Sequence, residues 1–331
     1  MRWLRNIVLV LLTIIAVLVT IWAAAALYFD SPFPALRPVL AVVYLLVIVG
    51  ALLVLRRSRA GLVVALAGFA IVALWWFTLK PTNRSDWQPD NAQTAYADIN
   101  GDQVTIHNFR NCSYRTETDY TCQWETRSYN LSNLRGADAF ITWWGSPWIA
   151  HPIASFDFGD QGHVAMSIET RDVMGQSYSA IRGFFRQYAL TYIATDERDV
   201  IRLRTDYRKD EEVYLFRTTV KPEMARKIFL DYLERANELH RQPEWYNAIT
   251  NNCTTNIVVS ADQARKTRMR LDYRILLSGY LPNYAYDMGA TDTSIPFERL
   301  RDLARIHDKA AHADTDPDFS AKIRAGLPIP H

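Results

Sequence analysis

The sequence predicts an α+β protein in which three N-terminal transmembrane helices precede an outer domain with an antiparallel sheet and packed helices. Three observations predict this. Apolar runs fill the first 80 residues, short segments of alternating polarity follow them, and an amphipathic helical pattern begins at Pro222. We expect a membrane anchor over residues 1–80, a linker over 81–93, an α+β domain over 94–290, and a C-terminal helix with a polar tail over 291–331.

The membrane anchor is predicted from three apolar runs, Ile7–Phe29, Pro38–Leu55 and Gly61–Leu79. A spanning helix needs about 20 apolar residues, so the second and third runs are near the short end of the range. The alternative is a cleaved signal peptide followed by buried core helices. No cleavage signal follows the first run, and three spans are therefore the favoured interpretation.

The arginines of the short loops predict the orientation of the spans. Arg2 and Arg5 precede the first span, three arginines lie within residues 56–59, and the loop between the first two spans carries only Arg37. The positive-inside rule then places the N-terminus and the 56–59 loop in the cytoplasm. Everything after Leu79 lies on the other side of the membrane.

The charge balance of the outer region excludes one class of partner. Residues 80–331 carry 31 Lys and Arg against 34 Asp and Glu, a net charge of −3, and they contain no basic block. Nucleic-acid binding therefore has no support. The sequence also lacks the His-Glu-x-x-His, Cys-x-x-Cys and phosphate-loop patterns, so we expect neither a metal nor a cofactor.

The outer domain is expected to contain short strands followed by helices. An Asn100-Gly101 turn and the turn Gly159–Gly162 each predict a hairpin. The expected elements are strands within 94–127, 153–170, 190–195, 200–204 and 213–220, and helices from Pro222 to before Pro243, over 253–266 and over 296–311, with a frayed polar tail behind them.

The chain has three cysteines, and the predicted topology changes how they are interpreted. Cys112 and Cys122 enclose a short polar run outside the cytoplasm, where disulfides persist, so we expect them to be bonded. Cys253 is then left as a free thiol.

Cys253 follows Asn252, and asparagine is among the best helix-capping residues. The cysteine would lie in the first helical turn, where free amides and the helix dipole stabilise an anion. Such a position lowers the pKa of a thiol toward neutrality and favours the reactive thiolate. The alternative is a buried cysteine that acts as a small apolar residue.

A cysteine nucleophile needs a nearby base, and His163 is the leading candidate because it opens a strand directly after a glycine-rich turn. His151 is the main rival. A histidine on a strand is by itself more often structural than catalytic.

Two segments, about 80 residues apart, resemble a known family. They are Gly162-His163-Val164-Ala165-Met166-Ser167-Ile168-Glu169 and Asn251-Asn252-Cys253-Thr254. In these segments the chain resembles the DUF4105 family of membrane-anchored bacterial proteins, which are like the Lnb N-terminal periplasmic domain. The resemblance covers roughly residues 85–290. More distantly, His163 and Cys253 resemble the pair in the circularly permuted NlpC/P60 (papain-like) hydrolases. This implies a permuted papain-like domain, with Cys253 attacking an amide or ester carbonyl and His163 acting as base.

The group that would orient His163 is less clear. Glu169 belongs to the matching segment, but six strand residues separate it from His163 by roughly 20 Å. If Phe158 pairs with His163, Asp157 points to the opposite face. Tyr178 or Ser179, on an expected following strand, would fit by position. The alternative role for Glu169 is a salt bridge with Arg171 or Arg182.

Trp143, Trp144 and Trp148 precede the hairpin and could wall a groove for a sugar or an acyl chain; packing against the core or the membrane surface is the alternative. We expect Trp143, Trp144 and Asn252 to contact substrate.

The sequence therefore predicts a periplasmic cysteine hydrolase or acyltransferase anchored by three spans in the bacterial inner membrane. Amide bonds of cell-envelope peptides such as peptidoglycan are the leading substrate, and acyl groups of lipid or lipoprotein are second. The expected partners are the lipid bilayer and such a substrate. The competing hypothesis is a non-enzymatic envelope chaperone or assembly module.

Overall fold

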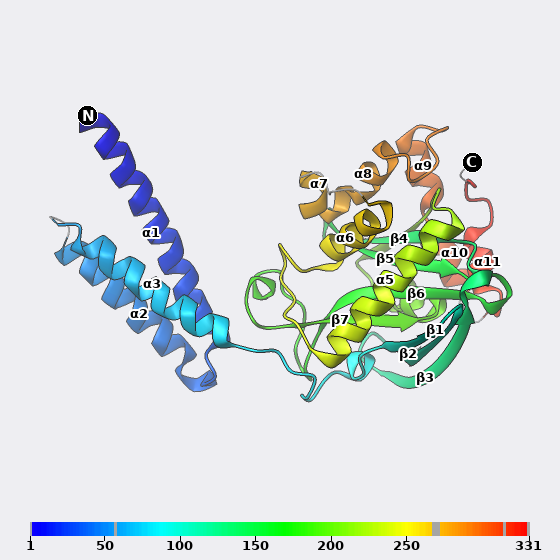
Figure 1. Cartoon of the computed structure of the whole chain (residues 1–331), viewed down its shortest axis with the longest axis horizontal. Coiled ribbons are helices and arrows are strands. Elements are labelled where there is room, and N and C mark those ends of the chain that lie inside the picture. The colour runs from blue at the N-terminus through cyan, green and yellow to red at the C-terminus, as the bar shows by residue number, and fades with distance from the viewer. Residues whose placement is uncertain (1, 56–57, 267–271, 314–315, 330–331) are drawn as a thin grey trace. The chain divides into compact units, whose positions relative to one another are not determined.

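The computed structural model describes residues 2–55, 58–266, 272–313 and 316–329 (Figure 1). The chain forms two compact units. The first contains Met1–Pro81 together with Tyr178–Tyr188 and Trp245–Asn247, and the second contains the remaining residues. Arg56 and Arg57, on which the expected orientation partly depends, lie outside the described residues.

The first unit contains three long apolar helices, as expected. They are α1 (Arg2–Asp30), α2 (Arg37–Val54) and α3 (Ala60–Thr78), and each is long and apolar enough to cross a membrane. Small residues line their contacts, with Ala16, Ala23 and Ala65 fully buried. A side chain on Gly61 would meet the backbone of α2 at 3.1 Å, so this glycine permits close approach of α3.

The second unit is built on an eight-stranded sheet, which confirms the α+β fold class. The strand order is β1-β2-β7-β6-β5-β4-β8, with β3 paired to β2. All pairs are antiparallel except β2 with β7. The strands are β1 (Tyr96–Asn100), β2 (Gln103–Tyr114), β3 (Tyr120–Asn130), β4 (Gly136–Trp144), β5 (Ser146–Asp157), β6 (His163–Arg171), β7 (Ala189–Thr195) and β8 (Glu211–Arg217).

Both expected hairpins are confirmed. Gly101 adopts a positive φ of 61° in the turn between β1 and β2, and Gly162 adopts a φ of 83° just before β6. Glycine reaches this region without the steric cost that other residues carry. The second hairpin joins β5 to β6 and begins the strand that carries His163.

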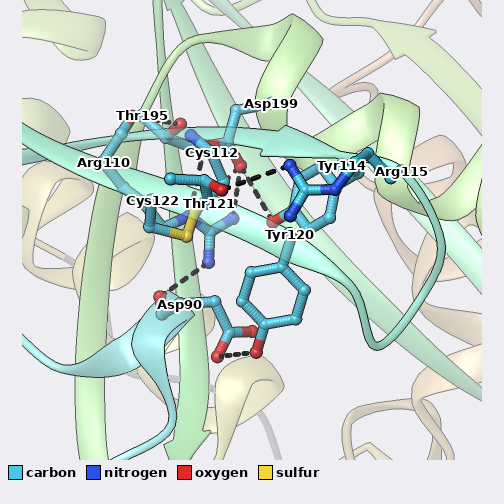
Figure 2. Close-up of a disulfide and its surroundings, with 10 residues drawn as sticks. All are labelled: Asp90, Arg110, Cys112, Tyr114, Arg115, Tyr120, Thr121, Cys122, Thr195 and Asp199. Carbon is cyan, nitrogen blue, oxygen red and sulfur yellow. Dashed lines mark hydrogen bonds and ion pairs between the residues drawn. A yellow bond between two sulfur atoms is a disulfide. The ribbon is translucent and has the colours of Figure 1, made fainter.

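The disulfide between Cys112 and Cys122 is confirmed and joins directly opposed residues of β2 and β3 (Figure 2). Beside it, Asp199 accepts a hydrogen bond from the amide of Cys112 at 2.6 Å. The same carboxylate pairs with Arg110 at 2.7 Å, and both side chains are almost completely buried. The Arg110 guanidinium also donates to the carbonyl of Asp90, so this hairpin is tied to two other segments.

Helices cover both faces of the sheet (Figure 1). One face packs against α5 (Pro222–Arg241), where Phe156 of β5 contacts Phe229 and Tyr232. Next to α5 lies α6 (Cys253–Arg265). The other face packs against α4 (Glu197–Arg202), α10 (His307–His312) and α11 (Phe319–Arg324). The remaining helices are α7 (Tyr273–Leu276), α8 (Leu281–Asp287) and α9 (Phe297–Ala304).

The prediction of a strand over residues 200–204 is wrong. This segment forms the end of α4 and a following π-helical turn over Leu203–Tyr207. Asp196 caps α4 by accepting a hydrogen bond from the amide of Asp199. Val200 and Ile201 are fully buried against the sheet, so tertiary packing overrides the strand preference of these β-branched residues.

The expected C-terminal organisation is also partly wrong. The single helix expected over 296–311 is divided into α9 and α10, because Arg305 is extended and bridges to Tyr214 of β8. The frayed tail is instead a packed element, since Phe319 and Ile323 of α11 are buried in the core.

Candidate active site

Helix α6 begins at Cys253 because Asn252 caps it. The side-chain oxygen of Asn252 accepts a hydrogen bond from the amide of Thr255 at 2.9 Å, and the amide of Asn252 donates to the Thr255 hydroxyl at 2.9 Å. This is a capping box, and it confirms the expected cap. The Asn252 side-chain NH₂ donates to the carbonyl of Ala248 at 2.8 Å. Both ends of this amide, which we also expect to contact substrate, are therefore engaged, the oxygen in the cap and the NH₂ group with Ala248.

The thiol of Cys253 is partly buried, and its pKa moves in the direction opposite to the one expected. Burial outweighs the hydrogen bonds from the Thr254 hydroxyl and from the amides of Thr254 and Cys253, which lower the pKa, and the pKa of the thiol is raised to about 11. The prediction of a thiol pKa near neutrality is wrong because loss of solvation outweighs the helix start. The sulfur lies 3.9 Å from the Thr254 hydroxyl and is protonated at neutral pH.

An apolar cavity of about 180 Å³ lies beside α6. Ile257 and Ala261 line it, and they follow Cys253 at intervals of four residues, so the three side chains form one row along the helix. Side chains from α5, α8 and three strands also line the cavity, together with Thr291. Those from the helices and strands include Ala139, Ile141, Ala154, Phe156, Phe216, Ile228, Tyr232, Leu281 and Ala285.

Two of the lining residues carry buried hydroxyl groups. Tyr232 is 1 % exposed and Thr291 is 3 % exposed, and neither hydroxyl has a hydrogen-bond partner within the part of the chain that the structure describes. Burial raises the pKa of Tyr232 well above its usual value, and the nearby Cys253 contributes in the same direction. The phenol is therefore a neutral donor near the thiol.

A second cavity, polar and about 520 Å³ in volume, lies between α5 and α6. Its lining includes Asp231, Glu234 and Glu238, with Arg235 as the basic group. This groove was not predicted from the sequence. Its signal was available, since these residues form the polar face of α5 opposite the apolar stripe.

His163 lies on a different face of the sheet from Cys253. It pairs with Asp157 of β5, and its Nε2 atom is 3.9 Å from the Asp157 carboxylate. Asp157 therefore shares a face with His163, and the expectation that it points away is wrong. The Nε2 atom is buried without a hydrogen-bond partner among the described residues.

The alternation of β5 identifies which face this is. Ala154 lines the cavity beside α6, whereas the next residue, Ser155, donates a hydrogen bond to Glu197 of α4. Ser155 pairs with Ala165, and His163 lies two residues before Ala165 on the same face. The structure therefore does not bring His163 and Cys253 together.

Glu169 is connected through the Ser167 hydroxyl with His151 rather than with His163. The Ser167 hydroxyl donates to Glu169 at 2.6 Å, so the Nε2 atom of His151, 2.8 Å from the same hydroxyl, must be its donor. Burial, together with the positive charge of Arg204, lowers the pKa of His151 to about 4, so the ring is neutral. This network positions a histidine but does not activate Ser167, whose hydroxyl is fully buried.

The salt-bridge partner of Glu169 is also different from the expected ones. Burial by itself raises the pKa of this carboxyl, but the guanidinium groups of Arg204 and Arg110 hold it at about 2. Arg204 lies 3.3 Å away, in place of the expected Arg171 or Arg182. The negative charge of Glu169 contributes to raising the pKa of Cys253.

Tyr178 and Ser179 are not on a strand; they lie in the connection between β6 and β7 and belong to the first unit. Trp143 packs beside the core that includes Val258 of α6, and its Nε1 atom donates to the carbonyl of Gly279 at 3.2 Å. Trp144 is partly exposed at the end of β4, and Trp148 is largely exposed. Packing therefore accounts for Trp143.

Comparison with protein families gives a match. Residues 120–279 match the family described as the Lnb N-terminal periplasmic domain. This range includes β3 to β8, α5 and α6, and with them His163, Glu169 and Cys253. No curated protein and no solved structure matches the chain. The similarity indicates a periplasmic domain, and it supports a membrane protein whose C-terminal domain is periplasmic.

Proposed function

We propose that this protein is an inner-membrane acyltransferase or hydrolase that acts on acyl groups of lipids or lipoproteins through a thioester on Cys253. The N-terminus lies in the cytoplasm and the C-terminal domain in the periplasm. Cleavage of amide bonds in peptidoglycan peptides is now the second substrate class, because an apolar cavity suits a chain of methylene groups better than a polar peptide.

The observation that carries the proposal is the row of Cys253, Ile257 and Ala261 on α6. Its first member is the only free cysteine, and the other two line the apolar cavity. A chain that enters this cavity would leave its carbonyl end toward the first turn of the helix. There the amides of Cys253 and Thr254 already hydrogen-bond the sulfur.

The proposed reaction has two steps. The thiol loses its proton, the sulfur attacks the carbonyl carbon, and a carbon–sulfur bond forms as the bond to the leaving alcohol or amine breaks and that group takes up a proton. Water or an amine then attacks the thioester, the carbon–sulfur bond breaks, and the sulfur regains a proton.

No histidine hydrogen-bonds the sulfur among the described residues, so the first proton passes to solvent and acylation is slow at neutral pH. The resemblance to papain-like enzymes assigns this proton to His163 instead. The variants His163→Gln and His151→Gln distinguish the two cases. A loss of about 100-fold or more in acylation rate in one of them would identify that histidine as the base.

The proposal is tested by acylating the full-length protein, held in lipid nanodiscs, with p-nitrophenyl esters of increasing chain length. We expect an acyl adduct on Cys253 by mass spectrometry that hydroxylamine removes, and no adduct in Cys253→Ala. Ala261→Leu fills the cavity and should shift the preference to shorter chains. Gln263→Leu adds the same side chain to the same helix, but at the polar groove, and should leave the preference unchanged. If the yield of adduct does not depend on chain length in any variant, the cavity does not bind the acyl chain.

A non-enzymatic envelope module is the second candidate, and the raised pKa of Cys253 favours it. Envelope lipids and peptides from cells with Cys253→Ala should then equal those of wild type, while deletion of the whole gene changes them. A change in acylated lipids or lipoproteins with Cys253→Ala would favour the enzyme.

A further inference from the structure

The segment Tyr178–Tyr188 joins β6 to β7 in the sequence, yet it belongs to the compact unit of the membrane helices. Phe185 is buried there, with its ring centroid 4.9 Å from that of Phe29 and 6.5 Å from that of Trp22. Trp22 lies eight residues before the end of α1, which is about 12 Å along the helix axis at 1.5 Å per residue. Phe185 is therefore level with the last turns of α1 rather than beyond its end.

A buried carboxylate fastens this segment to α1 and α3. Asp30, at the end of α1, accepts hydrogen bonds from Trp76 Nε1 at 2.7 Å, from Gln187 Nε2 at 2.7 Å and from the amide of Arg186 at 3.1 Å. The guanidinium of Arg186 lies 3.9 Å from the ring centre of Trp76. A carboxylate is buried at low cost only when hydrogen-bond donors of this kind surround it. These contacts therefore hold the segment beside the end of α1.

The segment nevertheless exposes large apolar side chains. Ile181 is 64 % exposed and Phe184 is 40 % exposed. On α3, Phe77 is 70 % exposed in the last turn, where the apolar helix surface would meet lipid. Phe184 is the neighbour of Phe185, which packs against the last turns of α1, so the exposed apolar side chains of the segment lie near the ends of the spans. A bilayer is the medium that covers both apolar surfaces.

The backbone of the segment suits such a medium. A short 3₁₀ helix over Arg182–Phe184 forms hydrogen bonds from the amide of Gly183 to Ser179, of Phe184 to Ile181 and of Phe185 to Arg182. Irregular backbone is not tolerated against hydrocarbon unless its polar groups are satisfied. This arrangement fits the interface between headgroups and acyl chains.

We infer that residues 178–188 form a second membrane contact, in which Ile181 and Phe184 enter the outer leaflet beside α1 and α3 while the exposed Arg182 faces lipid phosphates. The contact is independent of any reaction at Cys253. As a consequence, residues 178–188 are held at the membrane surface by lipid as well as by the hydrogen bonds that Asp30 accepts.

The test places the photo-crosslinker p-benzoylphenylalanine at position 184, 185 or 77 of the full-length protein in nanodiscs that contain alkyne-tagged phospholipid. The neighbouring phenylalanines are matched, because Phe184 is exposed and Phe185 is buried against α1. We expect lipid adducts at position 184 comparable to those at position 77, and severalfold fewer at position 185, where the crosslink should join α1.

Absence of lipid adducts at position 184, with adducts present at position 77, would overturn the inference. A crosslink from position 184 to another protein in native membranes would overturn it as well, because the occupant would then be a protein partner. Since every variant retains Cys253, loss of this contact and loss of acylation are measured separately.

Discussion

At the residue scale, the chemistry of the site depends on the ionisation of Cys253. The sequence correctly identifies a free cysteine in the first turn of a capped helix. It does not reveal how much solvent the surrounding helices remove from the sulfur, and this loss of solvation sets the direction in which the pKa moves. Local context predicts the helix dipole and the cap, whereas burial is a property of the folded chain.

The raised thiol pKa predicts how fast Cys253 is alkylated. Because the thiolate is the reacting species, the rate with iodoacetamide should rise about tenfold per pH unit between neutrality and the pKa. Thr254→Val removes a hydrogen bond that lowers the pKa, so this variant should react more slowly at each pH. Mass spectrometry of the full-length protein measures the rates. A plateau near neutral pH would show that the thiol pKa is not raised.

Glu197 predicts a second pH dependence. Burial alone raises the pKa of this carboxyl, but Arg324 of α11 outweighs burial and holds it at about 2, below the ordinary value of 4.5. A depressed pKa contributes stability above the unfolded value, and this stability is lost as the pH falls from 4.5 to about 2.

Glu197→Gln should therefore lower the free energy of unfolding by about 3 kcal/mol at neutral pH, with the difference shrinking below pH 4.5. Urea unfolding in nanodiscs, followed by tryptophan fluorescence, measures it. Glu223→Gln, at an exposed position of α5, is the control and should change little. A difference that stays constant across this pH range would disprove the ionic origin.

At the scale of elements, hairpins and the amphipathic helix were predictable because their signals are local. Glycine turns identify the hairpins, and the four-residue spacing of apolar side chains identifies α5. Helix α4 and the tail helix α11 were missed because contacts with distant parts of the chain decide them. Val200 and Phe319 belong to one core cluster, although more than a hundred residues separate them.

Removing the disulfide should destabilise the hairpin of β2 and β3. Replacing Cys112 and Cys122 together by serine frees a loop with a sequence separation of 10. Loop-closure entropy then predicts a loss of about 2–3 kcal/mol in the free energy of unfolding. Urea unfolding tests it, and dithiothreitol should affect wild type but not the double variant. Equal sensitivity of both proteins to the reductant would contradict the prediction.

Helix α11 should contribute strongly to stability, although its surroundings in the sequence are polar. Ile323 is fully buried, so Ile323→Ala should lower the free energy of unfolding by about 2–4 kcal/mol. Lys322→Ala, at the neighbouring exposed position, should cost less than about 0.5 kcal/mol. Similar losses in the two variants would mean that the tail does not pack on the core.

At the scale of the whole molecule, the three apolar helices and the periplasmic family match together support an envelope protein. Alkaline phosphatase is active only where its disulfides form, so fusions report the side of the membrane. We expect activity for fusions after Lys80 and after His331, and none for a fusion after Arg59. The reverse pattern would invert the proposed orientation.

The sequence by itself determined the features that depend on short spacing: three apolar helices, an α+β outer domain, a bonded cysteine pair and a free Cys253 at a helix start. Only the tertiary structure decided which residues meet. Strand register places His163 opposite Asp157 and connects Glu169 with His151, and strand alternation puts His163 on the face away from α6. It also decided that Cys253 shares a row with the residues of an apolar cavity, because that cavity is formed by helices and strands that no local pattern can bring together.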